Sequence, residues 1–166
     1  MAASESNQAV IERAERLRAQ QRASQHKSEL LALVTFRLGP DTYALPADEV
    51  RGVIGRQPIV PIPSTPDHLL GVTHFRGEIL AVLDLKVLLG LSGAPADPKY
   101  LVIARPGADS AALGCDSCPD IVQVPADDIK LPRSAVGSTA ARYLRGTAVT
   151  AQGVIAVLDI ARVLQC

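Results

Sequence analysis

Apolar residues along most of this chain form short runs or alternate with polar residues, and turn-forming residues separate these segments. Such segments, with a turn after about 8–12 residues, are typical of short β-strands. The pattern predicts strands at 31–38, 42–45, 69–75, 79–83, 100–104 and 111–115, and a further strand that begins at Val53. Four prolines between positions 58 and 66 predict an extended connector, because proline cannot join the interior of a sheet.

The stretch 69–85 predicts a β-hairpin that leads into a short helix. Arg76-Gly77 has the chemistry of a tight turn, because glycine adopts positive φ without steric cost. The continuous apolar run 79–83 predicts a strand that is buried on both faces. Asp84 then stands where its side chain can cap a helix over 85–89.

The pattern occurs twice in the chain. Residues 154–160 align with 79–85, and Gly146 aligns with Gly71, at an offset of 75 residues. Ile121 and Val122 likewise align with Val53 and Ile54 at an offset of 68 residues. Residues 31–91 and 99–165 are therefore two copies of one arrangement. The second copy has Ala151-Gln152-Gly153 in place of Arg76-Gly77, so a function peculiar to one copy can lie at the first turn.

Each copy contains about five short strands, which predicts a small barrel, and two copies predict two barrels packed together. Neither copy is large enough to be stable alone by a wide margin. We therefore expect the apolar strands of both copies to share a third, central core, near Val82, Leu83, Val157 and Leu158.

Residues 1–29 differ from the rest in composition. Apolar residues recur there at helical spacing within a charged sequence, at Val10, Ile11, Ala14 and Leu17. This predicts a helix from about Gln8 to Arg22 and a polar linker from about Gln20 to Glu29. The apolar stripe is narrow, so two interpretations stay open: a solvated tail, or a helix docked on the body or on a partner.

The composition restricts the classes of function. The 166 residues are 48% hydrophobic, and 17 basic residues balance 17 acidic ones. A zero net charge with only 3% aromatic residues argues against nucleic-acid binding, which needs a basic surface or a stacking platform. The first residues do not resemble a secretory signal, and no apolar run has the length of a membrane span. We therefore expect a cytoplasmic protein without membrane insertion.

Candidate catalytic and metal-binding residues are few. Cys115 and Cys118 have the spacing of a redox or zinc pair, but zinc needs two further ligands, and the histidines at 26, 68 and 74 are scattered. The repeat aligns Cys118 with Val50, which favours ordinary packing. Asp84 and Asp159 occupy equal positions before a helix in each copy, which indicates caps. We therefore expect no enzymatic activity, catalytic residue, metal or cofactor; a thiol or metal protein using Cys115 and Cys118 is the alternative.

Several motifs carry a resemblance to a known family. They are Phe36–Gly39, Tyr43–Pro46, Ile62-Pro63, Gly71–Leu80, Leu83–Leu85, Leu113–Cys118 and Leu158–Ile160. Together they resemble the CheW-like coupling proteins of bacterial chemosensory arrays, over about residues 31–165. The resemblance implies a mainly β fold of two intertwined SH3-like five-stranded β-barrel subdomains, with short capping helices. It also implies two parts, an N-terminal helix and linker at 1–29 and a CheW-like domain at 30–166.

The resemblance further implies a non-enzymatic adaptor in signal transduction. Such an adaptor couples methyl-accepting chemoreceptors to a CheA-type histidine kinase. It would bind the kinase's regulatory domain, which has the same fold, and would take the cytoplasmic tip of the receptor in the groove between the barrels. A pathway other than flagellar taxis, such as pili, gliding or gene regulation, is the alternative within this class.

The same resemblance implies that partners bind at Val50, Gly71, Arg76 and Gly77. We expect His74 and Phe75, which directly precede Arg76, to belong to the same partner-binding site. Arg76 is the strongest of them, because the second copy has no arginine there and a short turn fixes its direction. The chain departs from the family's common pattern at three positions. His74 replaces an asparagine, Ala81 a proline and Gly52 a glutamate.

Overall fold

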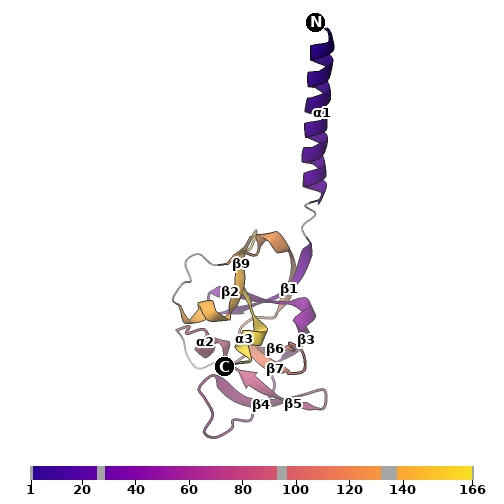
Figure 1. Ribbon diagram of the computed structural model, residues 1–166. Helices are drawn as coiled ribbons and strands as arrows, with labels where there is room; N and C mark the ends of the chain where they lie inside the picture. Colours follow the sequence, from indigo (N-terminus) through magenta and orange to yellow (C-terminus); the bar gives the residue numbers. More distant parts are fainter. Residues whose placement is uncertain (1, 26–28, 93–96, 132–137, 166) are drawn as a thin grey trace.

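A computed structural model describes residues 2–25, 29–92, 97–131 and 138–165 (Figure 1). The first half of the chain contains the strands β1 (Leu30–Leu38), β2 (Asp41–Pro46), β3 (Val50–Gly55), β4 (Leu69–Phe75) and β5 (Glu78–Leu83). The second half contains β6 (Tyr100–Ala104), β7 (Ala111–Cys115), β8 (Asp120–Pro125), β9 (Leu144–Thr150) and β10 (Gly153–Leu158). The helices are α1 (Ala2–Gln25), α2 (Leu85–Leu88) and α3 (Ile160–Val163), with 3₁₀ turns η1 (Ala47–Glu49), η2 (Ala126–Asp128) and η3 (Thr139–Tyr143).

The strands form two five-stranded sheets whose orders are β8-β1-β2-β10-β9 and β3-β6-β7-β5-β4. Each sheet therefore combines a hairpin from one half of the chain with three strands from the other half. The predicted mainly β fold of two intertwined barrels is confirmed. A sequence repeat is not itself a barrel, because β3 leaves its own hairpin and pairs with β6, while β8 pairs with β1.

The strand register reproduces the repeat found in the sequence. Val53 on β3 lies opposite Val102, and Ile121 on β8 lies opposite Val34. Both residues of the second pairing are thus 68 positions from their counterparts in the first. The exchange of strands is symmetric, and it joins the two halves along both sheets.

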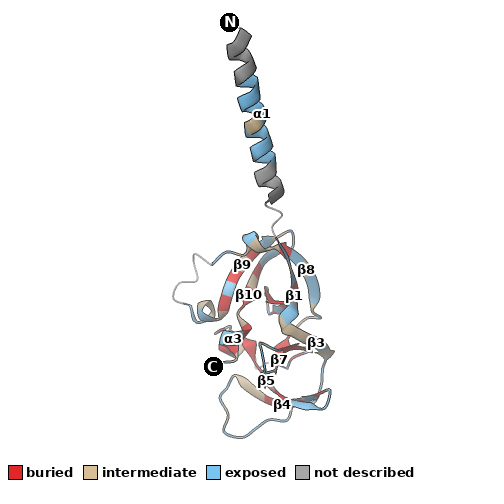
Figure 2. Cartoon of the chain, turned by 45° about the vertical axis from the view of Figure 1, so that its right-hand side comes forward, coloured by how far each residue is buried: buried red, intermediate tan, exposed pale blue. Residues whose placement is uncertain are grey.

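Three hydrophobic cores hold this arrangement together. Figure 2 shows that the buried residues lie within the β body. The largest is shared by both sheets and contains Leu83 and Leu158, which end β5 and β10. Val82 and Val157, one position earlier, point to the opposite side and lie in the separate cores of the two barrels. This follows from the two-residue period of a strand. The predicted central core is confirmed for Leu83 and Leu158, whereas the expectation that Val82 and Val157 lie near it is wrong.

Short helices follow both β5 and β10. The Asp84 carboxylate accepts from the backbone N–H of Lys86 at 2.9 Å and of Val87 at 3.4 Å, which caps α2. The Asp159 carboxylate accepts from the backbone N–H of Arg162 at 3.3 Å and caps α3. Both aspartates therefore have the structural role that the repeat predicted.

Two expectations about the strands are wrong. Residues 79–83 are not buried on both faces, because the side chain of Ile79 is 74% exposed and Ala81 is partly exposed. The reason is that this end of the hairpin extends beyond the neighbouring strand, since β5 pairs with β7 only from Ala81 to Leu83. The strand expected to begin at Val53 begins at Val50, because Val50 already pairs with Ala104 on β6.

Helix α1 is longer than predicted and extends away from the β body (Figure 1). It continues to Gln25, so the first part of the expected linker is helical, and the part at 26–28 lies outside the described residues. Val10, Ile11 and Leu17 are 62%, 54% and 53% exposed, so this apolar stripe does not pack on the body. No helix in the described part of the chain has the length and hydropathy needed to cross a membrane.

Candidate functional site

The hairpin between β4 and β5 turns at Arg76 and Gly77. Both residues have positive φ, 47° and 86°, and the strands pair directly from Phe75 to Glu78. Two such central residues define the type I′ turn that suits the twist of a β-hairpin. Arg76 adopts this conformation although it carries a side chain, and that side chain is exposed at the turn.

The Phe75 ring supports Arg76. The guanidinium carbon of Arg76 lies over the ring, 4.9 Å from its centre, at cation–π distance. The ring itself is buried, with Phe75 only 6% exposed. It packs beside Gly52 on β3, where an added Cβ would lie 3.2 Å from the Phe75 Cζ atom. The hairpin tip therefore contacts the edge strand of the same barrel.

A second arginine, Arg51 on β3, binds the hairpin through Glu78. Arg51 Nη1 and Nη2 donate to the two Glu78 carboxylate oxygens at 2.7 and 3.1 Å, and Nη1 also donates to Ser110 Oγ at 3.1 Å. The hydrogen bonds from Arg51 lower the pKa of Glu78, and the same contact raises the pKa of Arg51. Glu78 is thus fully engaged, whereas Arg76 forms no ion pair among the described residues.

A groove of about 300 Å³ separates the two barrels between β3 and β8. Its lining comprises Val34, Ala47, Val50, Arg51, Gly52, Val53, Pro119, Asp120 and Ile121. Val53 is 42% exposed and Ile121 is 64% exposed, so the groove presents apolar side chains from the edge of each sheet. Arg51 and Gly52 line it too, which makes the groove and the hairpin tip neighbours.

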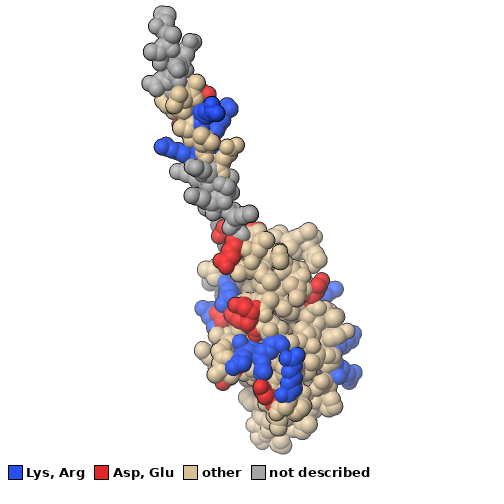
Figure 3. Space-filling model, turned by 90° about the vertical axis from the view of Figure 1, so that its right-hand side faces the viewer, with Lys and Arg blue, Asp and Glu red and all other residues tan. Residues whose placement is uncertain are grey.

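Figure 3 views the molecule from the side on which β3 lies in Figure 1. Basic and acidic side chains gather there over the lower part of the β body. The charges near the hairpin tip include Glu78 with Arg51, and Arg105, whose charge also lowers the Glu78 pKa. Arg51 and Arg105 thus both act on Glu78, and the exposed Arg76 follows Phe75 in the adjacent turn.

The predicted site residues occupy different places. Phe75, Arg76 and Gly77 meet at the hairpin tip, and Val50 lies in the groove. His74 is exposed on the outer face of the hairpin, opposite Ile79. The equivalent pair in the second barrel is Val149 opposite Val154, which are 76% and 61% exposed.

The packing of β4 against the connector explains why position 71 is a glycine. Val60 in the connector and Val72 on β4 exchange two backbone hydrogen bonds, of 2.8 and 2.9 Å. A Cβ on Gly71 would collide with the Val60 carbonyl, and its φ of 140° also favours glycine. Gly146 repeats the arrangement, because Lys130 and Thr147 form the same bridge beside it.

The cysteine pair does not have the geometry of a thiol site. Cys115 is buried on β7, with its Sγ near the Tyr100 and Ser117 carbonyls, and burial raises its pKa to about 12. A thiol with such a pKa is a poor nucleophile at neutral pH. Cys118 is exposed. Among the described residues, no group of His, Cys, Asp or Glu side chains is arranged to hold a metal ion.

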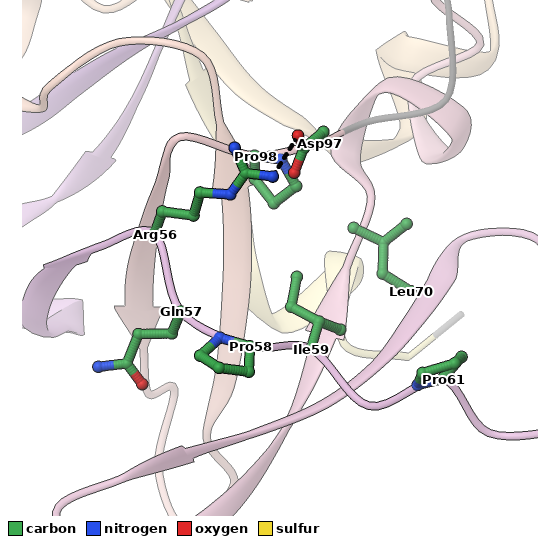
Figure 4. A pocket seen from close by; sticks show the side chains of 8 residues that line it. All are labelled: Arg56, Gln57, Pro58, Ile59, Pro61, Leu70, Asp97 and Pro98. Carbon is green, nitrogen blue, oxygen red and sulfur yellow. Dashed lines mark hydrogen bonds and ion pairs between the residues drawn. The ribbon is translucent and has the colours of Figure 1, made fainter.

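A larger pocket, of about 560 Å³, lies beside the connector (Figure 4). Its lining consists of Arg56, Gln57, Pro58, Ile59, Pro61, Leu70, Asp97 and Pro98. Arg56 Nη2 and Asp97 Oδ2 are 2.7 Å apart across it. These eight side chains include one ion pair and are otherwise apolar or uncharged.

Sequence reasoning missed four residues of the site. These are Arg51, Glu78, Val53 and Ile121, which come from three strands. The repeat aligned Val53 with Ile121 but gave no sign that both face one groove. Only the exchange of β3 and β8 between the sheets brings them together, and a repeat of this kind contains no signal for that exchange.

Comparisons with known proteins agree with this geometry. Residues 32–166 match the family model of the CheW-like domain. Protein FrzA of Myxococcus xanthus is 32% identical over 133 residues, which cover 78% of this chain and 82% of FrzA. The probable chemotaxis protein CheW of Rhizobium etli is 29% identical over 132 residues, which cover 77% of this chain and 83% of that protein.

A solved structure shows the same fold. The scaffolding protein TtCheW from Thermoanaerobacter tengcongensis superposes with a TM-score of 0.71, at 24% sequence identity. The superposition covers 81% of this chain and 88% of TtCheW. The chain belongs to the CheW-like domain family.

Proposed function

We propose that this protein is a non-enzymatic adaptor that couples chemoreceptors to a CheA-type histidine kinase in a cytoplasmic chemosensory array. The receptor's cytoplasmic tip would occupy the groove between β3 and β8. The kinase's regulatory domain would bind at the hairpin tip of β4 and β5. Membership of the CheW-like domain family and the fold shared with the scaffolding protein TtCheW support a scaffold rather than an enzyme.

One observation carries the proposal. Arg76 is exposed in a tight turn and, within the described part of the chain, forms no ion pair with a carboxylate, at a position where the other barrel has no arginine. A guanidinium presented in this way is suited to anchor an interface, because arginine binds a partner's carboxylate with little loss of freedom. The adjacent groove supplies a second, apolar surface for a different partner.

The outer ends of the barrels support a quasi-symmetric pairing with a kinase domain of the same fold. His74 opposite Ile79 on one barrel corresponds to Val149 opposite Val154 on the other. The two ends thus have matching strand registers, but their turns and side chains differ, because Arg76 has positive φ and the equivalent Ala151 does not. A partner with the same fold can meet either end, and the side chains decide which end it prefers.

Replacing Arg76 tests this function. Arg76→Ala should change the free energy of unfolding by no more than about 0.5 kcal/mol, as expected for a surface substitution. It should weaken binding of the regulatory domain of a CheA-type kinase from the same genome by about 2 kcal/mol or more. Arg76→Lys should restore only part of this loss if the guanidinium fork is used. Calorimetric titration and thermal melting measure both quantities.

Arg56→Ala is the matched control, because Arg56 is another exposed arginine with only a surface carboxylate partner, Asp97. It should bind the kinase domain like the parent. For the groove, Ile121→Glu should weaken receptor binding and leave kinase binding unchanged. An Arg76→Ala variant that melts and binds like the parent would remove the main support for the proposal.

A further inference from the structure

We propose that Gly52, Phe75 and the Arg51–Glu78 pair are positioning residues that hold the Arg76 guanidinium ready for a carboxylate of the partner. The inference rests on the proposed function, because it concerns how this chain presents Arg76 there. It adds the partner's chemistry and names four residues that fix the geometry.

The Phe75 ring is held in one position by its surroundings. Phe75 is almost fully buried, so the ring has a defined position rather than a free rotation at the surface. Gly52 makes room for it, since a Cβ there would lie 3.2 Å from Cζ and 3.7 Å from Cε2 of the ring. A Cβ contact of 3.2 Å is tighter than ordinary packing, so a side chain at position 52 would displace the ring.

The charge of Arg76 is not neutralised by the neighbouring Glu78. Glu78, two residues away on the same turn, is the nearest carboxylate along the hairpin and could neutralise Arg76. Arg51 prevents this, because its two terminal nitrogens take both oxygens of Glu78. Ser110 Oγ accepts another hydrogen bond from Arg51 and holds it in place. Arg76 is therefore left with the face of the Phe75 ring, 4.9 Å away, and with solvent.

The position of Phe75 and the charge of Arg76, which is unpaired among the described residues, indicate which group of a partner would bind here. A guanidinium group that lies over an aromatic ring uses its flat face for that contact. Its N–H groups point outward in the plane of the guanidinium, where they can donate to an acceptor. The acceptor that matches two parallel N–H groups is a carboxylate. The partner should therefore bring an Asp or Glu side chain to the hairpin tip. Because Glu78 is occupied, the partner does not have to displace an internal ion pair.

The two glycines of β3 provide a matched test. Gly52→Ala adds a methyl group against the Phe75 ring, whereas Gly55→Ala adds one where nothing lies within 4 Å. Neither glycine has positive φ, so alanine fits the backbone at both positions. The side-chain Nε–Hε signals of arginine in the ¹⁵N-labelled full chain report on the guanidinium directly. Loss of one signal in Arg76→Lys assigns the Arg76 resonance.

We expect the ring current of Phe75 to displace the Arg76 signal from its usual position. Phe75→Leu should remove this displacement, Gly52→Ala should change it, and Gly55→Ala should leave it unaltered. Gly52→Ala should also weaken kinase-domain binding by about two- to fivefold, the range of an exposed cation–π contact, whereas Gly55→Ala should not. Phe75→Leu keeps an apolar core side chain, so its spectrum remains interpretable if Gly52→Ala is poorly folded.

The outcomes separate this inference from the proposed function. An Arg76 signal that is the same in the parent, Gly52→Ala and Phe75→Leu would overturn the inference, whatever the binding result. If Arg76→Ala weakens binding but Gly52→Ala moves the signal without changing affinity, the positioning role is wrong and the proposed function stands. If Arg76→Ala itself binds normally while the signal moves as expected, the partner role of Arg76 fails, and the claim of a carboxylate partner fails with it.

Discussion

Leu83 and Leu158 end equivalent strands in different sheets, and both lie in the core that the two barrels share. Leu83 is 7% exposed and Leu158 is fully buried. Their positions mean that neither barrel can complete its inner surface without the other. We therefore expect the groove between β3 and β8 and the hairpin tip to belong to one cooperative unit.

Truncating these leucines should destabilise the whole β body. We expect Leu83→Ala and Leu158→Ala each to lower the free energy of unfolding by about 2–5 kcal/mol, as buried leucine truncations do. Ile79→Ala on the same strand as Leu83 is the control, and it should change stability by no more than about 0.5 kcal/mol because Ile79 is exposed. Urea denaturation measures all three. Equal losses for Leu83→Ala and Ile79→Ala would contradict the shared core.

A half-chain should not fold alone. A fragment of residues 31–91 contains β3, β4 and β5 but lacks β6 and β7, which lie between β3 and β5 in their sheet. Its strands β3 and β5 would have no partner between them, and its β1 edge would lose β8. We expect circular dichroism and urea titration to show no cooperative unfolding of this fragment. Cooperative unfolding with a native-like spectrum would show that the exchange of strands is dispensable.

The sequence contained most of the fold and a part of the site. Period-two patterning and turn residues located the strands, and the position of Asp84 before an apolar turn identified a cap. The partner contact implied for Gly71 stays a prediction, and the structure adds a packing reason for this glycine, because a Cβ there would collide with the Val60 carbonyl. Ile79 shows the limit of hydropathy, because an apolar run cannot reveal where a neighbouring strand stops.

The site was only partly predictable for a related reason. Arg51 and Glu78 are 27 residues apart, and the bond between them depends on the hairpin tip folding back onto β3. No local pattern encodes such a contact. Arg76 could be found because it lies within one tight turn, where sequence and geometry are directly linked.

Lowering the pH should weaken the hydrogen bonds by which Asp116 connects the two halves of the chain. Asp116 accepts from Lys86 Nζ on α2 and from the Gly39 N–H in the β1–β2 turn. Burial raises the Asp116 pKa, but these hydrogen bonds outweigh it and hold the pKa below the ordinary 3.8. A carboxyl group with a lowered pKa contributes stability above its unfolded pKa and loses it as pH falls through the folded value.

The variant Asp116→Asn tests this dependence. It keeps the size of the side chain but cannot ionise, so its stability should fall less than that of the parent as the pH is lowered from neutral to below 3.8. At neutral pH the parent should be the more stable of the two. Urea unfolding across this range gives both curves. Parallel curves for the two proteins would exclude Asp116 as a source of acid sensitivity.

The cysteines should differ strongly in reactivity. Cys118 is exposed and should react with a thiol reagent at mildly alkaline pH, whereas Cys115 should react only after denaturation, because burial raises its pKa to about 12. Mass spectrometry of the labelled peptides identifies the modified residue. Rapid labelling of native Cys115, or a stoichiometric metal lost in a Cys115→Ser variant, would favour the thiol or metal interpretation instead.

Removing helix α1 should leave the β body intact. We expect deletion of residues 2–25 to change the melting temperature little, because the described apolar residues of the helix are exposed rather than packed on the body. If the helix contacts a partner, the same deletion should weaken assembly of the complex. Differential scanning calorimetry measures the first effect. A large loss of thermal stability would mean that the helix is part of the fold.

Simultaneous binding tests the central claim most directly. An adaptor with a groove between β3 and β8 and a separate anchor at Arg76 can hold two partners at once. Sedimentation velocity of the full chain with a receptor cytoplasmic fragment and a CheA-type regulatory domain should show one complex that contains all three. Ile121→Glu should remove only the receptor, and Arg76→Ala should remove only the kinase domain. Failure of either partner to bind, or displacement of one partner by the other, would contradict the account.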